Sequence, residues 1–477
     1  MSRSSVSAPA DAQRFISTHG AAPATSFGLA LRRGLAPDGG LYVPSRLPTM
    51  PSGVFDALPA ALDAPDAVAR TGRALFRHLL VDGGGDDDAH HLGPGLTPAV
   101  IDAALDAALD FPIPLVRLGE DDPGTWILEL FHGPTYAFKD VAARVMARLL
   151  GAVAAAESDP RPLTILVATS GDTGGAVAQA FHGVAGTRVV VLYPRGRVTA
   201  LQERQFATLG GNVLALAIDG SFDDCQALTK AVFADPALRD ALRLSSANSI
   251  NIGRLLPQAV YYLHAWAQLR AAGVDDAPVV VVPSGNFGNL TAGLIAQRLG
   301  TPIARFVAAT NANDVVPAYL ASGIYRPRPS QATASSAMDV GDPSNLARIR
   351  HLFDDDLDAL RAALRGSAHD DDETTATIRD VHARTDYVLD PHTAVGVAAL
   401  RALRADASAD DALRRAPAIV LATAHPIKFP AVVAPAIGGD PPSPPGADAL
   451  MRRTLRSEPL TGTLGALRAR LLAWSDA

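Results

Sequence analysis

The residue best suited to covalent chemistry is a lysine in an apolar setting. Only three of the 477 residues are lysine, at positions 139, 230 and 428, among 42 basic residues. Lys139 lies near the end of residues 130–140, an aromatic segment with a Gly-Pro pair, which we expect to join a strand to a helix. The helix dipole and burial favour the neutral amine there, the form that attacks a carbonyl to make a Schiff base. The alternative is a surface lysine. Lys230, on an amphipathic helical pattern, fits that description better, and Lys428 has no setting comparable to that of Lys139.

A glycine-rich segment at residues 168–175 predicts a first anion-binding site. It reads Ala-Thr-Ser-Gly-Asp-Thr-Gly-Gly and directly follows an apolar run of strand length. Ser170, Thr173 and the free amides of a helix start suit a carboxylate or a phosphate equally well. A dinucleotide site is the alternative, but the Gly-x-Gly-x-x-Gly pattern is absent. The acidic residue expected about 20 positions further on is also missing, because Tyr193 and Arg195 stand there.

A second glycine-rich segment at residues 283–289 predicts a phosphate site. It reads Pro-Ser-Gly-Asn-Phe-Gly-Asn and again lies between a strand pattern and a helix pattern. Gly285 and Gly288 let the backbone curl its amides around one phosphate, and the helix start at Asn289 adds its dipole. Two such segments predict two anions in one site, for example a cofactor phosphate and a substrate acid group.

A third polar segment, residues 248–254, combines helix caps with a cation. Asn248, Ser249 and Asn251 are hydrogen-bonding residues at a predicted helix start, and Arg254 lies on its first turns. A guanidinium binds a phosphate through two parallel hydrogen bonds. A simple capped helix would explain the Asn and Ser residues, but not Arg254 beside an apolar helix face.

The elements that position these residues follow an alternating pattern. Continuous apolar strands alternate with helices, which predicts parallel or mixed sheets covered on both faces. We therefore expect an α/β fold with two sheet units, and ligands at the carboxyl ends of the strands, where the polar segments fall. The clearest predicted strands cover residues 126–131, 163–169, 188–193, 213–218, 279–283 and 418–423, and the clearest helix covers residues 140–150.

The composition indicates a protein that acts on small molecules in a reducing compartment. A net charge of −7 and a pI near 5.9 provide no field that attracts nucleic acid or an anionic membrane. The N-terminus carries no signal-peptide pattern, and no apolar run has the ~20 residues of a membrane span. Cys225 is the single cysteine and is expected to be a buried spectator. We predict a cytoplasmic protein that acts as a monomer or a homodimer.

A patch of Gly, Asp and His at residues 83–91 has residue types that bind metals. It contains His90 and His91 after three aspartates, but its low complexity is typical of a solvated loop. We expect no metal there or elsewhere in the chain. Three other histidines lie in polar blocks near strand ends, and for each the better interpretation is a packed, hydrogen-bonded ring rather than a catalytic acid. They are His132, His392 and His425.

Taken together, the polar blocks resemble the threonine synthase family, in the long form found in bacteria and fungi. The resemblance also includes residues 15–20, 34–44, 337–345, 390–396 and 422–429, and runs in order from about residue 15 to 430. It implies a fold-type-II, tryptophan-synthase-β-like enzyme that uses pyridoxal 5′-phosphate (PLP) as its cofactor. The sequence departs from the family pattern at His19, where the family has Arg, and at Arg195 and Arg197, where it has Lys.

The resemblance assigns roles to matching residues. Lys139 would be the Schiff-base lysine and the catalytic acid and base, and Thr423 would bond the pyridine nitrogen. The predicted cofactor-binding residues are Lys139, Gly285, Asn286, Phe287, Gly288, Asn289 and Thr423. The predicted substrate-binding residues are Thr135, Ser170, Gly171, Asp172, Thr173, Asn248, Ser249 and Arg254.

The implied activity is that of a carbon–oxygen lyase acting on a phosphate, which makes L-threonine from O-phospho-L-homoserine and water. Two alternatives stay open: another PLP lyase of the same fold, such as a serine/threonine dehydratase or a phospho-lyase, and a binding protein without cofactor. We predict four segments: an N-terminal region (1–108), an α/β unit with Lys139 and the 170–173 loop (109–276), an α/β unit with the phosphate loop (277–437), and a C-terminal linker and helix (438–477).

Overall fold

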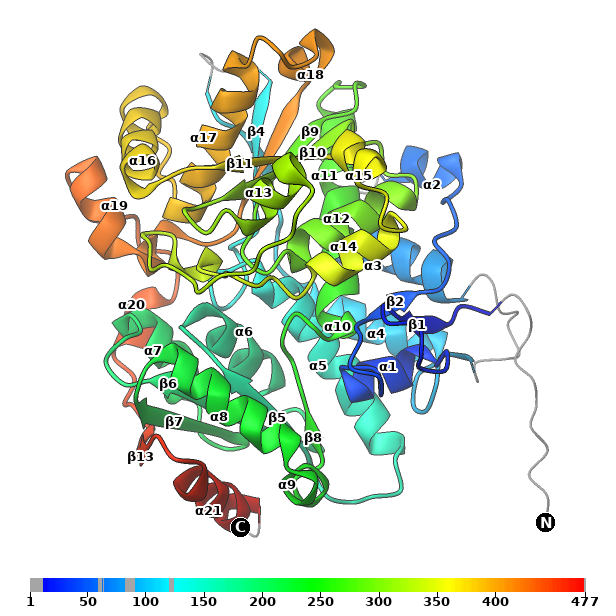
Figure 1. Cartoon of the computed structure of the whole chain (residues 1–477), viewed down its shortest axis with the longest axis vertical. Helices are drawn as coiled ribbons and strands as arrows, with labels where there is room; N and C mark the ends of the chain where they lie inside the picture. Colours follow the sequence, from blue (N-terminus) through cyan, green and yellow to red (C-terminus); the bar gives the residue numbers. More distant parts are fainter. Residues whose placement is uncertain (1–11, 59–61, 63, 82–90, 120–123, 476–477) are drawn as a thin grey trace.

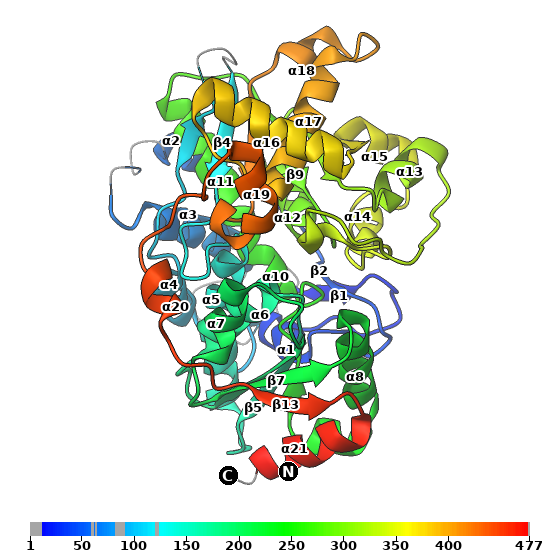
Figure 2. The ribbon, with the colours of Figure 1, turned by 90° about the vertical axis from the view of Figure 1, so that its left-hand side faces the viewer.

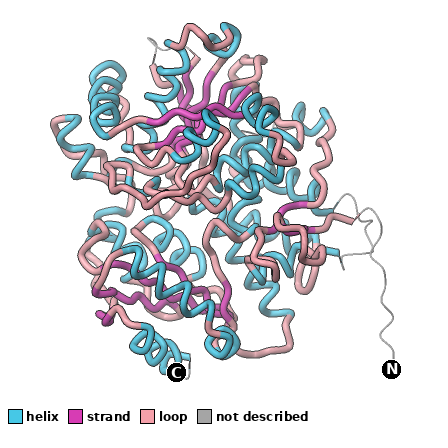
Figure 3. The backbone as a smooth tube through the Cα atoms, viewed as in Figure 1, coloured by secondary structure: helices cyan, strands magenta, loops and turns pink. Residues whose placement is uncertain are grey.

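The computed structural model describes residues 12–58, 62, 64–81, 91–119 and 124–475. Two sheets dominate it, one above the other in Figure 1, with an N-terminal region beside them. Figure 3 shows the two groups of strands separated by a belt of loops. The predicted α/β fold with two sheet units is confirmed, because one sheet is parallel and the other is mixed.

The larger sheet has six strands in the order β11-β10-β9-β12-β4-β3, and only β3 runs antiparallel to its neighbour. Its centre is made of apolar runs that are buried on both faces. In β9, Val279 and Val281 pack with helices α16 and α17, whereas Val280 and Val282 face the core that contains α11 and α12. The strands are β3 (Leu115–Arg117), β4 (Thr125–Glu129), β9 (Val279–Pro283), β10 (Arg305–Thr310), β11 (Leu364–Ala368) and β12 (Ala418–Ala422).

The helices around the larger sheet come from residues 259–437. They are α11 (Ala259–Ala271), α12 (Gly288–Arg298), α13 (Val315–Ser322), α14 (Leu346–Leu352), α15 (Leu357–Ala363), α16 (Asp371–Thr385), α17 (Pro391–Ala405), α18 (Asp411–Arg415) and α19 (Pro430–Ile437), with single turns η5 (Ser336–Met338) and η6 (Pro426–Lys428).

The smaller sheet has five parallel strands in the order β13-β7-β6-β5-β8. In β5, Leu166 packs with α8 and α21, whereas Ile165 and Val167 face the core shared with α5 and α6. The strands are β5 (Leu163–Ala168), β6 (Thr187–Pro194), β7 (Val213–Asp219), β8 (Leu244–Ser245) and β13 (Glu458–Thr461). The helices are α5 (Lys139–Ala156), α6 (Asp172–Phe181), α7 (Ala200–Ala207), α8 (Phe222–Ala234), α9 (Pro236–Ala241), α10 (Ile252–Leu255), η4 (Leu256–Gln258), α20 (Ala447–Met451) and α21 (Leu464–Ser475).

The C-terminal segment adds an unexpected strand. Residues 438–446 contain no helix or strand, as predicted for a linker, and α21 matches the predicted terminal helix. Between them, β13 pairs in parallel with β7 and extends the smaller sheet, which Figure 2 shows from the side. The segment from residue 438 therefore contributes to the core of the second predicted segment rather than lying apart from it.

Sheet membership also crosses the predicted boundary at residue 276. Strands β3 and β4 precede Lys139 in the chain but pair within the larger sheet, next to β12. The segment 109–276 thus contributes strands to both sheets. The four-segment division stays a proposal about sequence organisation, and the sheets divide the chain differently.

The N-terminal region packs against the helices that lead from the smaller sheet. It contains one antiparallel strand pair that the sequence did not indicate, and its helix α1 contacts α5 and α10. No helix in the described part of the chain is long and apolar enough to span a membrane. The elements are β1 (Phe15–Ser17), α1 (Phe27–Arg33), β2 (Tyr42–Pro44), α2 (Ser52–Ala57), α3 (Ala67–Phe76), η2 (Arg77–Val81) and α4 (Pro98–Ala108).

Candidate active site

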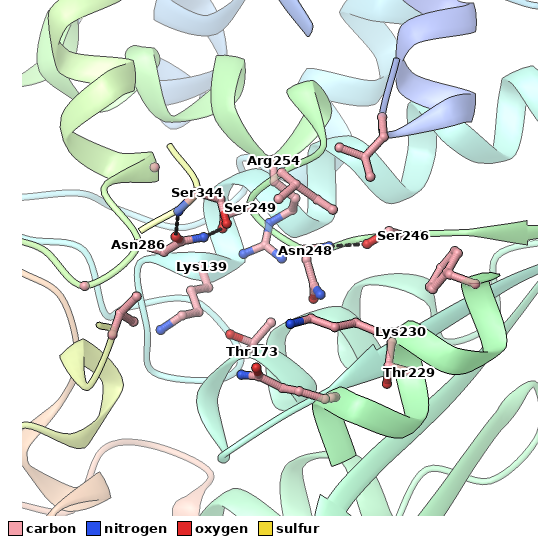
Figure 4. A pocket seen from close by; sticks show the side chains of 18 of the residues that line it. Lys139, Thr173, Thr229, Lys230, Ser246, Asn248, Ser249, Arg254, Asn286 and Ser344 are labelled. Carbon is pink, nitrogen blue, oxygen red and sulfur yellow. Dashed lines mark hydrogen bonds between the residues drawn. The ribbon is translucent and has the colours of Figure 1, made fainter. Parts of the chain in front are cut away.

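A cavity of about 1820 Å³ lies where the strands of both sheets end. Residues that follow β5 and β8 line it from the smaller sheet, and residues that follow β9 and β12 line it from the larger one. Figure 4 shows Lys139, Thr173, Asn248 and Arg254 around the same space. The cavity contains most of the predicted site, namely Lys139, Ser170, Asp172, Thr173, Asn248, Ser249, Arg254, Gly285, Asn286, Phe287, Gly288, Asn289 and Thr423.

Lys139 is the first residue of α5, and 14% of its side chain is exposed. Burial lowers the pKa of its amine, the neighbouring cations Lys428 and Arg254 lower it further, and Asp172 opposes the shift. The Nζ atom lies 3.7 Å from Asp172 Oδ2, which is beyond a strong hydrogen bond. The amine is therefore placed in the cavity with its neutral, nucleophilic form favoured.

The turn before Lys139 is held by a buried carboxylate. Asp140 accepts hydrogen bonds from Thr135 N at 2.7 Å and from Thr135 Oγ1 at 2.6 Å. A Cβ at Gly133 would lie 2.6 Å from Asp140 Oδ2, so only glycine fits there. Thr135 does not line the cavity, because its hydroxyl faces Asp140. The contact between Thr135 and a substrate therefore stays a prediction, and what the structure shows is its support of the turn.

The 170–173 loop follows β5 and begins α6. Thr169 Oγ1 accepts hydrogen bonds from Gly171 N at 2.9 Å and Gly174 N at 2.8 Å, which fixes the turn. Gly171 has φ 140°, and a Cβ there would lie 2.4 Å from Gln202, so it supports the loop from outside the cavity lining. The first-turn amides of a helix lack intrahelical partners. The loop presents the amides of Asp172 and Thr173 together with the side chains of Ser170 and Thr173, whereas Gly174 N is already bonded to Thr169.

The 285–289 loop follows β9 and begins α12. A Cβ at Gly285 would lie 2.7 Å from Met338 Cα, so a larger residue would push two backbones apart. Phe287 is left-handed with φ 60°, which turns the chain into the helix. The side chain of Asn289 forms its hydrogen bonds inside the loop: its Nδ2 donates to Pro283 O at 2.8 Å, and its Oδ1 accepts from Ser284 Oγ at 3.0 Å. The loop therefore offers backbone amides and a helix dipole, which are the groups that bind a phosphate.

Arg254 is a buried cation that forms no ion pair with another described residue. Only 3% of it is exposed, and burial lowers its pKa to about 10. Its Nη1 donates to Ala247 O at 2.7 Å, whereas its Nε has no hydrogen-bond partner within the described residues. No ion pair joins it to a carboxylate in the described part of the chain. A buried unpaired charge is costly, so this arrangement favours an anion supplied by a ligand.

The second and third anion segments touch each other. Asn286 Nδ2 donates to Ser249 Oγ at 2.6 Å, and Asn286 Oδ1 accepts from Ser344 N at 2.6 Å, as Figure 4 shows. Two anions bound there would be neighbours rather than occupants of separate sites.

Two supporting residues were not identified from the sequence. Arg348 is fully buried and donates to Ser249 O at 3.1 Å and to Tyr42 O at 2.9 Å. Asn345 donates through Nδ2 to Asn286 O at 3.0 Å and accepts through Oδ1 from Arg348 Nη1 at 2.7 Å. The 337–345 block belongs to the resemblance, and the structure shows that its Asn345 contacts the 285–289 loop directly and reaches Ser249 and β2 through Arg348.

Thr423 follows β12, is 6% exposed, and lines the cavity. Its carbonyl accepts a hydrogen bond from Phe138 N at 2.9 Å, which fixes the distance between this strand end and Lys139.

The surroundings of Lys428 differ from the prediction made from the sequence. Lys428 was judged to have no setting like that of Lys139, but it is fully buried and forms an ion pair with Asp172 at 2.7 Å. Its position, six residues after the end of β12, gave no indication of this. Lys230 is exposed, as expected, yet it lies at the cavity wall in Figure 4.

The three histidines are hydrogen-bonded, as expected. His392 Nδ1 lies 2.7 Å from Asp390 Oδ1, and its Nε2 accepts from Ala337 N at 3.2 Å. His132 Nε2 lies 2.7 Å from Glu129 Oε2. His425 accepts from Ile427 N, and burial lowers its pKa to about 4.

Other predicted features also have clear outcomes. Cys225 is buried, which raises its thiol pKa to about 11 and fits a spectator. Residues 83–90 of the Gly-Asp-His patch lie outside the described residues. His91 is buried rather than solvated, with Nε2 2.8 Å from Leu80 O. His19 is exposed and does not line the cavity. Arg32, Arg33 and Leu35 are among the residues of the N-terminal region that do line it.

The residues present fit PLP. The glycine-dependent 285–289 loop fits its phosphate, the buried amine of Lys139 fits its aldehyde, and the Thr423 hydroxyl in the cavity lining fits a ring nitrogen. The cavity also leaves Arg254 for a second anion.

Comparison with known proteins agrees with this geometry. Residues 109–416 match the family of pyridoxal-phosphate dependent enzymes, residues 14–61 match the threonine synthase N terminus, and residues 393–470 match the threonine synthase C-terminal family. A threonine synthase from Serratia marcescens is 42% identical over 448 residues, covering 94% of this chain and 96% of its own. One from Haemophilus influenzae is 43% identical over 450 residues, covering 94% and 96%.

A solved structure gives the same result for the fold. The crystal structure of PLP-bound threonine synthase from Brucella melitensis superposes with a TM-score of 0.85 at 37% identity, covering 98% of this chain and 100% of that one. PLP is therefore the cofactor of this enzyme. The chain belongs to the threonine synthase family of PLP-dependent, fold-type-II enzymes.

Proposed function

We propose that the enzyme converts O-phospho-L-homoserine and water into L-threonine and inorganic phosphate. The observation that carries this proposal is Arg254, a buried guanidinium that faces the cavity without an anionic partner among the described residues. An amino acid with a phosphate ester supplies that anion, and its carboxylate suits the amides of the 170–173 loop. Serine and threonine, the substrates of a dehydratase, carry no second anion.

The cofactor is held by groups from three strand ends. Lys139 bonds it covalently, the amides of residues 285–289 bind its phosphate, and the Thr423 hydroxyl bonds its pyridine nitrogen. When bound, PLP withdraws electrons from the substrate's α-carbon, and a neutral hydroxyl at the ring nitrogen moderates that effect. The amine of Lys139, with its pKa lowered by burial, then takes and returns protons at the substrate's carbon atoms.

The substrate is oriented by its two charged ends. Ser170, Thr173 and the first amides of α6 bind the carboxylate, and Asn248, Ser249 and Arg254 bind the phosphate. Asn286 donates to Ser249 at 2.6 Å, so the cofactor loop and the substrate loop are directly connected. Departure of the phosphate leaves it beside Arg254, where its negative charge is stabilised.

The proposal extends to the enzyme's surroundings. The partner is a small molecule, the compartment is the cytoplasm, which suits a single buried Cys225, and the protein acts as a monomer or a homodimer.

A substrate comparison tests the reaction. The purified enzyme is offered O-phospho-L-homoserine, L-serine and L-threonine side by side, with phosphate and oxo-acid release as readouts. We expect phosphate and threonine from the first compound only. Equal or faster turnover of serine or threonine to an oxo acid would favour the dehydratase alternative. A protein that gains no visible absorbance on adding PLP would favour a binding protein without cofactor.

A further inference from the structure

A second buried lysine lies directly behind the cavity wall. The side chain of Lys428, in η6, is 0% exposed, and this residue does not line the cavity. Its Nζ donates to Asp172 Oδ1 at 2.7 Å and to Thr135 O at 2.8 Å. Lysine is almost never fully buried unless its charge is paired, so the position of this residue has to be explained by Asp172.

Asp172 is an unusual residue for its place. It begins α6 inside the loop to which we assign the substrate carboxylate, and it is 5% exposed. Burial raises its pKa, but Lys428 and Lys139 lower it well below the usual 3.8, so the carboxylate is ionised. An uncompensated negative charge there would repel an anionic substrate. Lys428 provides the compensation from behind the wall.

The two oxygens of Asp172 have different tasks. Oδ1 accepts from Lys428 at 2.7 Å and from Gln202 Nε2 at 2.9 Å. Oδ2 faces Lys139 Nζ at 3.7 Å, which is too long for a strong hydrogen bond. The closer cation therefore holds the carboxylate, and Lys139 is left without a tight ion pair.

Charged groups reach Lys139 from several elements. Asp172 comes from α6, Lys428 from η6 and Arg254 from α10, and Asp140 lies on its own helix with its carboxylate turned to Thr135. Asp172 is the anion among them that faces the amine at 3.7 Å. Whatever controls its charge therefore controls how readily the amine loses its proton.

We propose that Lys428 is a positioning residue that holds Asp172 and cancels its charge, so that the amine of Lys139 stays free to react. The inference rests on the proposed role of Lys139 as the cofactor-binding lysine. A purely structural bridge between η6, α6 and the 133–140 turn is the competing explanation. Such a bridge would affect folding but not the ionisation of Lys139.

The scarcity of lysine allows a direct test. The full-length chain, freed of cofactor, is trace-acetylated with acetic anhydride across about pH 6 to 10, a reaction that only neutral amines undergo. Mass spectrometry of the three lysine peptides then gives the pH midpoint of each amine. The exposed Lys230 reports the reactivity of a surface amine in the same sample and serves as the internal reference.

The expected changes follow from the charges. In Lys428→Met, the carboxylate of Asp172 has Lys139 as its remaining cation, so the midpoint of Lys139 rises by about one pH unit, or about tenfold less neutral amine near pH 7.5. In Lys428→Met with Asp172→Asn, the midpoint returns to or below that of the unaltered chain. In Asp172→Asn alone, it falls, because the anion is gone and Lys428 remains.

Three results would overturn the proposal. They are a Lys139 midpoint that stays within about 0.3 unit in Lys428→Met, a midpoint that falls in that variant, and a double variant whose midpoint stays as high as that of Lys428→Met. If Lys428→Met does not fold, Asp172→Asn decides: a lower midpoint supports the proposal, and an unchanged or higher one overturns it.

A separate measurement tests the role of Lys139 itself. The unaltered chain is loaded with PLP and reduced with borohydride, and the labelled peptide is identified. A label away from Lys139 would contradict the proposed function, whatever the acetylation midpoints. A label on Lys139 with unchanged midpoints in the variants would contradict only the role of Lys428.

Discussion

Two buried cations, Lys428 and Arg254, lie near the Lys139 amine, and they differ in whether a protein carboxylate pairs with them. Lys428 is fully buried and paired with a protein carboxylate at 2.7 Å. Arg254 is 3% exposed, lines the cavity, and has no carboxylate partner within the described residues. The protein itself supplies the counter-charge of a paired cation, whereas a bound ligand supplies the counter-charge of an unpaired one. The contrast separates a residue that organises the site from one that receives a substrate.

The largest effect is expected when the Lys139 amine, which lies near both cations, is removed. Lys139→Ala should lower threonine formation by at least about a thousandfold, because both the covalent link and the proton transfers are lost. Initial rates with saturating PLP measure this. The circular dichroism spectrum should be unchanged. Although only 14% of this side chain is exposed, its amine forms no tight contact whose loss would disturb the fold. Activity within tenfold of the unaltered enzyme would contradict the assignment.

The next largest effect is a loss of stability when the paired cation, Lys428, is replaced. Lys428→Met leaves the Asp172 carboxylate buried without its closest partner, which should lower the free energy of unfolding by about 3 kcal/mol or more. Adding Asp172→Asn should restore much of the loss, because no uncompensated charge remains. Urea unfolding of the single and double variants measures both. A double variant less stable than Lys428→Met would show that the pair is not the cause.

The unpaired cation should behave in the reverse way. Arg254→Met should lower kcat/KM for O-phospho-L-homoserine by about tenfold to a hundredfold, the value of one charge-assisted contact of about 1.5–3 kcal/mol. Its effect on the free energy of unfolding should be smaller than that of Lys428→Met, because no protein anion is orphaned. Steady-state kinetics within twofold of the unaltered enzyme would remove Arg254 from the phosphate site.

The smallest effect uses the product as a probe. Inorganic phosphate should raise the melting temperature of the PLP-loaded enzyme by a few degrees at about 100 times its Kd, equivalent to about 2.7 kcal/mol. The shift should disappear in Arg254→Met and persist in a folded Lys428→Met variant. An equal shift in Arg254→Met would place the anion elsewhere.

The parts of the fold that the sequence predicted are those buried on both faces. β5, β9 and β12 are mainly apolar, fully buried runs that match the predicted strands to within a residue. The strands that were missed include the buried β10, but others are short or mixed in polarity. β13 reads Glu-Pro-Leu-Thr and is partly exposed, and β8 has two residues. Such edge strands are defined by their neighbours in the sheet and not by their own composition.

The site divides along similar lines. Loops that begin helices after strands carry local signals, so Lys139, the 170–173 loop and the 285–289 loop were found from their residues. Lys428 and Arg348 were not, because their partners are distant in the chain: Lys428 bonds Thr135 and Asp172, and Arg348 bonds Tyr42 and Ser249. A buried cation and a surface cation look alike until the tertiary contacts are known.

The most direct test of the central claim is to find which lysine holds the cofactor. The enzyme is loaded with PLP, reduced with borohydride and digested, and the mass of each of the three lysine peptides is measured. The account predicts the pyridoxyl mass on the peptide that contains Lys139, with those of Lys230 and Lys428 unmodified. A pyridoxyl group on either of the other two, or on none, would contradict it.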